Sequence, residues 1–342
     1  MVNPVHGGPD ARGAAQYDFS TNSNACGPCP HTLAAVQQAD ATRYPDPSYT
    51  ALRAALADFH FVAPERIVLA ASASEFIHRI TALAAQQGAR AVALPAHSYG
   101  DYAQAAQVRG LQWLRPADDD YRSAGLHWAC EPSSPLGGAD PALAVWPGAP
   151  HNAALRIVDC AYQPLRLHAH SAPELPSAAW QLWTPNKALG LTGVRAAYAI
   201  APAGAELGVA ALSALAPSWP VGAHGVAMLQ SWVTPASQRW LADCLPVLRD
   251  WKSQQQALCA ELGWTVLPAS QANYFCARLP LPALDIAAAL QQLREQHGIQ
   301  LRDCTSFGLP GVVRLGVLPP AAQSALRAAW PCNMKKTMSI TP

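Results

Sequence analysis

Short apolar runs alternate with stretches of helical spacing from Tyr44 to Ala201. Continuous apolar runs of this length predict buried strands, and the stretches between them predict connecting helices. The predicted helices include residues 72–88, which end at Gly88, and residues 98–110. Apolar strands that alternate with helices indicate an α/β fold, with a mainly parallel sheet covered on both faces. We expect its strands at residues 66–70, 90–95, 111–114, 125–130, 155–160, 179–183 and 195–201.

The pattern changes after Ala201, where the helical stretches lengthen and the strands come in pairs. Helical patterns over 211–233 and 237–262 precede two strands over 264–279, a helix over 284–298 and two strands over 299–318. This order indicates a smaller α+β domain. We therefore expect four parts: an N-terminal arm that belongs partly to the small domain (1–40), a large cofactor-binding domain (41–210), a small domain (211–332) and a disordered tail (333–342).

The composition narrows the class of protein. Of the 342 residues, 51% are hydrophobic and 13% are charged, which supplies a large core and argues against disorder. The formal net charge of +1 provides no basic field for nucleic acid. No apolar stretch is long enough to span a bilayer, and the N-terminus lacks the features of a signal peptide. We expect a cytoplasmic protein that binds neither nucleic acid nor membrane.

Cys26-Gly27-Pro28-Cys29 spells the four residues of a thioredoxin active site. That motif functions directly after a buried strand, whereas here the polar stretch DFSTNSNA precedes it. A metal site with Cys26, Cys29 and His31 lacks a second pair of ligands. We therefore favour a tight Gly-Pro turn and expect no metal. A redox pair remains the alternative.

Lys187 carries the strongest chemical signal, because it follows a buried strand by a few residues. A lysine at the edge of a sheet can be desolvated, which lowers its pKa and makes the amine a nucleophile. Thr184 and Arg195 flank it with a hydroxyl and a guanidinium that can bind a phosphate. A surface lysine in a loop is the alternative interpretation.

Two further segments carry polar groups at predicted strand ends. Asp159 closes the strand 155–160, and Tyr162 follows it. A buried cation such as a pyridinium nitrogen can keep such an acid ionised, although an aspartate there could equally cap a helix. The small-residue turn over 70–76, with Ala73 and Ser74, opens a helix and can bind a phosphate through backbone amides.

Together these segments resemble the fold-type I pyridoxal-phosphate (PLP) enzymes, the aspartate-aminotransferase-like superfamily, from His6 to about Ala329. The resemblance implies that Lys187 forms a Schiff base with PLP while Asp159 contacts the ring nitrogen. It also implies that Ser134 stands where the superfamily usually has an asparagine beside the ring oxygen. The remaining implied cofactor contacts are the following: Tyr162 with the ring oxygen, Thr184, Arg195, Ala73 and Ser74 with the phosphate, Tyr99 or Tyr102 stacked on the ring, and Tyr44 from the partner subunit of a homodimer.

Within the superfamily, the chain resembles the histidinol-phosphate aminotransferase branch, and within that branch the L-threonine-O-3-phosphate decarboxylases of cobalamin biosynthesis. The likeness lies in HGG (6–8), YDFSTNSNACGP (17–28), RYPDPSY (43–49) and LRDCTSFGLPGVVRLGV (301–317). It implies a small phosphorylated amino acid as substrate, with phosphate contacts from His6, Asn24, Arg302 and Arg314.

The reaction stays open at this point. Decarboxylation to (R)-1-amino-2-propanol phosphate is the first expectation from the resemblance. A histidinol-phosphate-type aminotransferase is the second. The third is a non-catalytic subunit that joins a partner in cobinamide synthesis, an alternative that Ser134 encourages because it shortens a cofactor-binding side chain.

Overall fold

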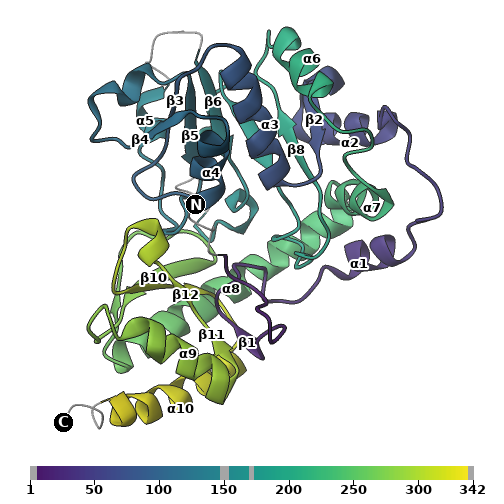
Figure 1. The fold of residues 1–342 in the computed structure, drawn as a ribbon. Coiled ribbons are helices and arrows are strands. Elements are labelled where there is room, and N and C mark those ends of the chain that lie inside the picture. Colours follow the sequence, from purple (N-terminus) through teal and green to yellow (C-terminus); the bar gives the residue numbers. More distant parts are fainter. Residues whose placement is uncertain (1–5, 147–153, 169–172, 338–342) are drawn as a thin grey trace.

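The computed structural model describes residues 6–146, 154–168 and 173–337. A large α/β unit lies above a smaller α+β unit in Figure 1. The expected α/β architecture is confirmed, with a mostly parallel sheet in the larger unit and a smaller α+β unit beside it.

The larger unit is built on a seven-stranded sheet in the order β2-β8-β7-β6-β5-β3-β4. In this sheet β8 runs antiparallel to the other six strands, which are all parallel to one another. The chain passes from β7 to β8 through a loop without a crossover helix, and a parallel pair would need such a crossover. The strands are β2 (Ile67–Ala70), β3 (Ala91–Ala93), β4 (Gln112–Leu114), β5 (Leu126–Cys130), β6 (Leu155–Asp159), β7 (Trp180–Trp183) and β8 (Ala197–Ile200).

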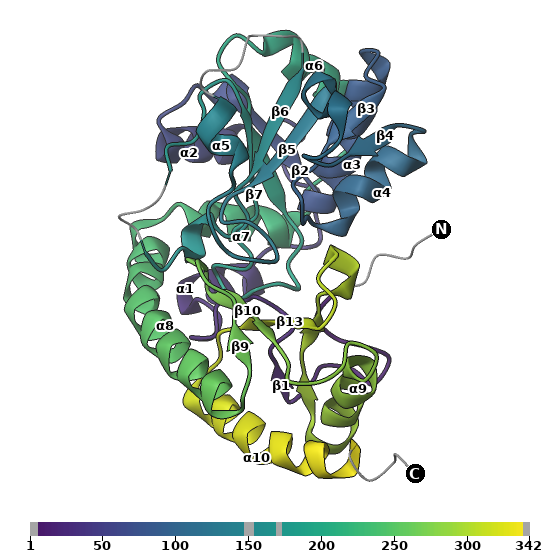
Figure 2. The same cartoon turned by 90° about the vertical axis from the view of Figure 1, so that its left-hand side faces the viewer.

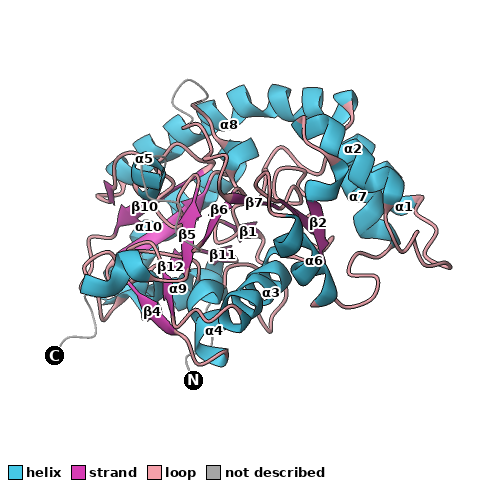
Figure 3. Cartoon of the chain, turned by 90° about the horizontal axis from the view of Figure 1, so that it is seen from above, coloured by secondary structure: helices cyan, strands magenta, loops and turns pink. Residues whose placement is uncertain are grey.

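Helices cover both faces of this sheet, as Figure 3 shows from above. One face packs against α3 (Ala73–Gln86), α4 (Gly100–Val108) and α6 (Glu206–Ala214). The other packs against α1 (Pro30–Gln37), α2 (Thr50–His60), α7 (Ala223–Trp232) and the first half of α8 (Pro235–Glu261). Large aromatic and branched side chains fill the two cores, among them Trp128, Trp180, Leu52 and Ile77. Burial on both faces explains why the strands read as continuous apolar runs.

A single helix over 211–233 was expected, and the structure shows that this is wrong. The chain leaves α6 after Ala214 and begins α7 at Ala223. Pro217 and Pro220 lie between them and cannot donate the backbone hydrogen bonds of a helix. Trp219, between these prolines, has a φ of 48°, outside the helical region.

The smaller unit combines an antiparallel sheet, in the order β12-β13-β10-β9, with two helices. Its elements are β9 (Thr265–Val266), β10 (Tyr274–Arg278), α9 (Ile286–His297), β11 (Ile299–Gln300), β12 (Arg302–Asp303), β13 (Val312–Gly316) and α10 (Pro320–Thr337). The N-terminal strand β1 (Tyr17–Asp18) pairs with β11, so the arm joins this unit. Helix α8 runs from the larger unit to the smaller one, as Figure 2 shows.

Helix α10 continues to Thr337, so residues 333–337 are helical although a disordered tail was expected from residue 333. Adding residues to an existing helix costs little compared with starting one. Residues 338–342 lie outside the described residues. Within the described part of the chain, every helix is too short or too polar to cross a membrane. The remaining short helical segments are η1 (Pro64–Arg66), η2 (Asp119–Ser123), α5 (Ala142–Val145), η4 (Gln163–Leu165) and η6 (Thr305–Phe307).

Candidate active site

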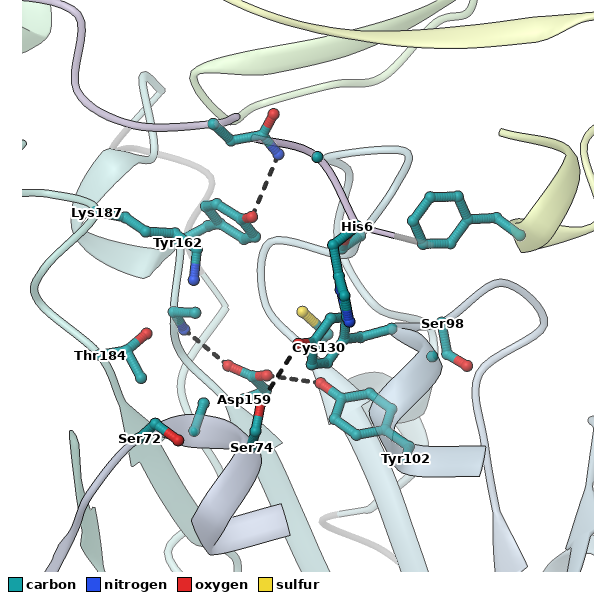
Figure 4. Close-up of a pocket in the computed structure, with 18 of the residues that line it drawn as sticks. His6, Ser72, Ser74, Ser98, Tyr102, Cys130, Asp159, Tyr162, Thr184 and Lys187 are labelled. Atoms are coloured by element: carbon teal, nitrogen blue, oxygen red, sulfur yellow. Dashed lines mark hydrogen bonds between the residues drawn. The ribbon is translucent and has the colours of Figure 1, made fainter. Parts of the chain in front are cut away.

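A cavity of about 650 Å³ lies where the carboxyl ends of the large-sheet strands meet the smaller unit and the N-terminal arm. Figure 4 shows part of its lining. Ligands bind at this edge of a parallel sheet because the loops that follow the strands converge there. Most of the predicted site residues line it: His6, Ala73, Ser74, Tyr99, Tyr102, Ser134, Asp159, Tyr162, Thr184, Lys187, Arg195, Arg302 and Arg314.

Asp159 ends β6 with its carboxylate buried at the base of the cavity. The Tyr102 hydroxyl donates to its Oδ2 at 2.6 Å, and the Ala161 N–H donates to its Oδ1 at 3.0 Å (Figure 4). Burial raises the pKa of Asp159, while the bond from Tyr102 and the charge of Lys187 oppose that rise. A buried carboxylate of this kind is stabilised in its charged form by a cation placed beside it.

Lys187 lies in the loop between β7 and β8. Its Nζ is 5.0 Å from the centre of the Tyr162 ring. The Tyr162 hydroxyl accepts a hydrogen bond from Asn22 Nδ2 at 3.3 Å. An amine and a phenol thus lie together above the carboxylate of Asp159, as Figure 4 shows. This set can form a covalent bond through the amine and move protons through both groups.

Asn24 does not line this cavity, contrary to the expectation that it contacts substrate. Its backbone N–H donates to Lys187 O at 2.9 Å, and its Nδ2 donates to Ala188 O at 3.0 Å. Asn22 lines the cavity instead, with its Oδ1 buried and without a hydrogen-bond partner among the described residues. The segment STNSN presents two asparagines, and only the path of the chain decides which one turns inward.

The Cys-Gly-Pro-Cys turn supports the lysine loop from behind. The Cys29 N–H donates to Leu189 O at 2.8 Å. A Cβ on Gly190 would lie 2.5 Å from the Gly27 carbonyl oxygen, so the two backbones approach as closely as glycine permits. Both Cys26 and Cys29 are free thiols, and Cys29 is fully buried. The turn therefore has a structural role, the support of the lysine loop, and this role does not involve redox chemistry.

One end of the cavity is suited to an anion. The buried Thr184 Oγ1 has no hydrogen-bond partner among the residues that the structure describes. Ser72 caps α3 by accepting from the Glu75 N–H at 3.1 Å, and the first turn of α3, at Ala73 and Ser74, faces the cavity. Helix N-termini attract anions through their free N–H groups and their dipole. Arg195 lies exposed at the rim and adds a cation.

The two tyrosines proposed as alternatives for ring stacking have different surroundings. Tyr102 is fully buried, and its ring stacks on Trp128 with centroids 4.3 Å apart. Its hydroxyl is bonded to Asp159, so its part in the site is to hold that carboxylate. Tyr99 is only partly buried at the cavity wall. Of these two tyrosines, Tyr99 is therefore the candidate for packing against the ring of a ligand.

Two buried arginines form the opposite wall. Arg302 on β12 and Arg314 on β13 are direct partners in the antiparallel register. Arg314 donates to Ser134 Oγ at 3.3 Å and to Ser20 O at 3.1 Å. Burial lowers the pKa of Arg302, and the neighbouring charge of Arg314 lowers it further. No carboxylate of the described residues forms an ion pair with Arg314.

His6 points into the cavity from the N-terminal arm (Figure 4). Its ring lies 5.8 Å from that of Tyr99, and its Nε2 lies 3.9 Å from the buried carboxylate of Asp101. Tyr44, in contrast, is 77% exposed and stacks on Trp219, away from the cavity of its own chain. Its predicted contact with the cofactor of a partner subunit remains a prediction.

Several known proteins are similar to this chain. A histidinol-phosphate aminotransferase of Jannaschia sp. (strain CCS1) is 27% identical over 333 residues, covering 91% of this chain and 89% of the relative. The structure of histidinol-phosphate aminotransferase from Sinorhizobium meliloti in complex with pyridoxal-5'-phosphate superposes with a TM-score of 0.79, at 22% identity over 94% of this chain and 92% of that chain. The structure of L-threonine-O-3-phosphate decarboxylase from Porphyromonas gingivalis superposes with a TM-score of 0.77. Its sequence is 20% identical, and the match covers 93% of this chain and 99% of that chain.

The residues of the cavity fit pyridoxal phosphate. The unpartnered Thr184 hydroxyl and the start of α3 suit its phosphate, and the buried carboxylate of Asp159 suits a protonated ring nitrogen. The sequence model of aminotransferase class I and II matches residues 14–328, nearly the whole chain. This match shows that the chain belongs to the aminotransferase class I and II family, with the fold of the type I pyridoxal-phosphate enzymes and pyridoxal phosphate as cofactor.

Proposed function

We propose that this enzyme decarboxylates L-threonine O-3-phosphate to (R)-1-amino-2-propanol phosphate with pyridoxal phosphate as cofactor. The observation that supports a phosphorylated amino acid as substrate is the pair of buried arginines, Arg302 and Arg314, side by side in the wall of the cavity. Two adjacent guanidinium groups match a phosphate dianion in charge and in hydrogen-bond geometry. The proposal also draws on the similarity to the decarboxylase from P. gingivalis.

When bound, pyridoxal phosphate accepts the electron pair released as a bond to the amino-bearing carbon breaks. In our proposal Lys187 holds the cofactor covalently and moves protons at the reacting carbon. Asp159, fixed by Tyr102, keeps the ring nitrogen protonated. Tyr162, oriented by Asn22, donates to the ring oxygen.

The remaining cofactor contacts follow from the cavity wall. Thr184, Arg195 and the first turn of α3 would hold the cofactor phosphate. Tyr99 would pack against the ring. Ser134 would contribute a hydroxyl in place of the usual amide, because its oxygen accepts from Arg314 and its own proton stays available.

The choice of reaction follows from which substrate group the arginines bind. With Arg302, Arg314 and His6 on the substrate phosphate and Arg195 on the cofactor phosphate, the described part of the cavity wall has no guanidinium dedicated to the carboxylate. Arg115 also lines the cavity, but it is engaged with Ser98 Oγ at 2.9 Å. A carboxylate that is not held is free to align for cleavage and leave as carbon dioxide.

Transamination of histidinol phosphate is the second candidate. The curated relative at 27% identity bears that name. Histidinol phosphate also carries a phosphate for the arginine pair, so the pair is compatible with either substrate. The two reactions differ in their requirement for an oxo acid, because only transamination needs an acceptor for the amino group.

The deciding experiment measures carbon dioxide release from L-threonine phosphate by the holoenzyme without any oxo acid. We expect release that Lys187→Ala abolishes and that Arg314→Ala slows by about a hundredfold in kcat/KM. Arg327→Ala, which removes an exposed guanidinium paired with Glu261, is the matched control and should leave the rate unchanged. No release, together with glutamate formation from histidinol phosphate and 2-oxoglutarate, would establish the aminotransferase instead.

A further inference from the structure

One aromatic ring faces both arginines of the cavity wall. Phe307, in the short helix η6 that follows β12, lines the cavity. Its ring centre lies 4.8 Å from Arg302 Cζ and 5.8 Å from Arg314 Cζ. Arg314 also lies 5.6 Å from the ring centre of Tyr274. Neither the family resemblance nor the charge pattern of the sequence assigns a role to Phe307.

The arginine pair needs such a neighbour. Two buried guanidinium groups on adjacent strands repel each other, and burial removes the water that would screen them. A carboxylate between them would neutralise the repulsion but would compete with the substrate for the same donors. The face of an aromatic ring attracts a cation electrostatically. The N–H bonds of a guanidinium lie in its own plane, so a ring stacked on the group does not accept them. Phe307 can therefore stabilise the pair without taking up a hydrogen-bond donor of either guanidinium.

The position of this ring depends on the larger unit. His97, in the loop between β3 and α4, contacts Phe307 O through its Nδ1 at 2.7 Å, with the ring nitrogen donating to the carbonyl. The Phe307 N–H donates to Cys304 O at 2.9 Å within its own unit. The segment then turns at Gly308, which has a φ of 79°. Phe307 is thus fixed from both sides of the cavity.

We propose that Phe307 is a positioning residue that holds Arg302 and Arg314 together for a doubly charged anion through the π face of its ring. The inference rests on the proposed function in one respect: the anion is the phosphate of the substrate. It adds the requirement that the electron density of this ring, and not only its size, sets the affinity for that phosphate.

The test replaces Phe307 in the holoenzyme by phenylalanines with one, three and five ring fluorines. Fluorination withdraws electron density from the ring face at nearly constant shape, so the protein keeps its packing. We expect KM for L-threonine phosphate and the inhibition constant of inorganic phosphate to rise stepwise, by about tenfold at five fluorines. The value of kcat should stay within about twofold. Phe307→Tyr, which retains an electron-rich face, should resemble the unmodified enzyme.

The same series at Phe61, which is 95% exposed, is the control and should change neither constant. Constants at position 307 that do not depend on fluorination would overturn the inference. The variant Arg314→Ala distinguishes an error about the role of Phe307 from an error about the proposed function. If that variant weakens phosphate inhibition and the fluorine series does not, the role of Phe307 is wrong and the function stands. If Arg314→Ala also leaves phosphate inhibition and KM unchanged, both are wrong.

Discussion

At the scale of single residues, the site is organised by groups that are costly to bury alone. Among the described residues, Tyr102 and the Ala161 N–H are the hydrogen-bond donors to the buried Asp159 carboxylate, and its pKa is raised mainly by burial. Thr184 Oγ1 and Asn22 Oδ1 are buried without partners among the described residues. Such groups lower the stability of the protein alone and gain partners when ligands bind. The same buried polar groups therefore lower the stability of the unliganded protein and supply the contacts that bind a ligand.

The raised pKa of Asp159 leads to a prediction for the apoprotein. A carboxyl whose pKa rises on folding above its ordinary value of 3.8 stabilises the fold while protonated, and this contribution is lost as the pH rises through the raised pKa. Asp159→Asn should therefore raise the Tm of the apoprotein at pH 7 by about 2 °C or more. The same change should lower turnover of the holoenzyme at least about a hundredfold.

Thermal unfolding of both apoproteins between pH 4 and 8 measures this effect. The difference in Tm should grow with pH, because only the wild type must ionise a buried carboxyl. An apoprotein that Asp159→Asn destabilises at pH 7 would show that the carboxylate is already compensated in the absence of cofactor.

The two cysteines of the N-terminal turn allow a second prediction at this scale. Cys29 donates its backbone N–H to the lysine loop, and that contact does not involve its thiol. Replacing Cys26 and Cys29 together by serine should therefore leave kcat within about threefold and stability within about 2 kcal/mol. Loss of activity in a double variant that folds normally, or activity that depends on reductant in the wild type, would restore the redox interpretation.

At the scale of elements, the site depends on how a few segments are held against one another. The helix α8 contributes to both cores, with Leu248 in the larger unit and Leu258 in the smaller. Near its middle, the buried Lys252 Nζ donates to Ser270 O at 2.7 Å and to Ala272 O at 2.9 Å. This lysine ties α8 to the segment that leads into β10, whose partner strand β13 carries Arg314.

Burial lowers the pKa of Lys252 to about 8. The unfolded chain keeps this proton up to its ordinary pKa of 10.5, so the folded state gains stability as the pH rises from about 8 toward 10.5. Lys252→Met should remove this gain, which urea unfolding at pH 7.5 and pH 9.5 would detect. Gln254→Met, on an exposed position of α8, is the control. Equal pH dependence in wild type and Lys252→Met would contradict the assignment.

At the scale of the whole molecule, one chain brings thirteen of the predicted residues to one cavity but leaves Asn24 and Tyr44 outside it. Tyr44 is exposed and stacked on Trp219, which itself is 40% exposed. An exposed aromatic pair of this kind is typical of a surface that meets another protein. From the family resemblance we expect that surface to lie in a homodimer in which each chain completes the site of the other.

This arrangement can be tested by complementation. Lys187→Ala and Tyr44→Ala should each lower activity when assayed alone. Mixed dimers, formed by refolding the two variants together, should recover up to about a quarter of wild-type activity, because half of the dimers are mixed and each holds one site with both residues intact. Recovery would place Tyr44 in the site of the partner. No recovery despite confirmed mixed dimers would exclude that role.

Much of this molecule follows from its sequence alone. The apolar runs predict the strands of the large sheet because a strand buried on both faces has no polar positions. The residues after those strands, Asp159, Thr184 and Lys187, could be assigned to one edge because parallel strands end together. The single helix predicted over 211–233 is wrong because Pro217 and Pro220 interrupt a pattern that is otherwise apolar and helical.

Only the tertiary structure decided which side chains face one another. It selects Asn22 over Asn24, gives Tyr102 rather than Tyr99 to the carboxylate, and places the Cys-Gly-Pro-Cys turn behind the lysine loop. It also brings Phe307 to both arginines. These pairings join segments far apart in the chain. The local pattern of a sequence reports whether a residue is buried, whereas its neighbour across a cavity is set by the packing of the whole molecule.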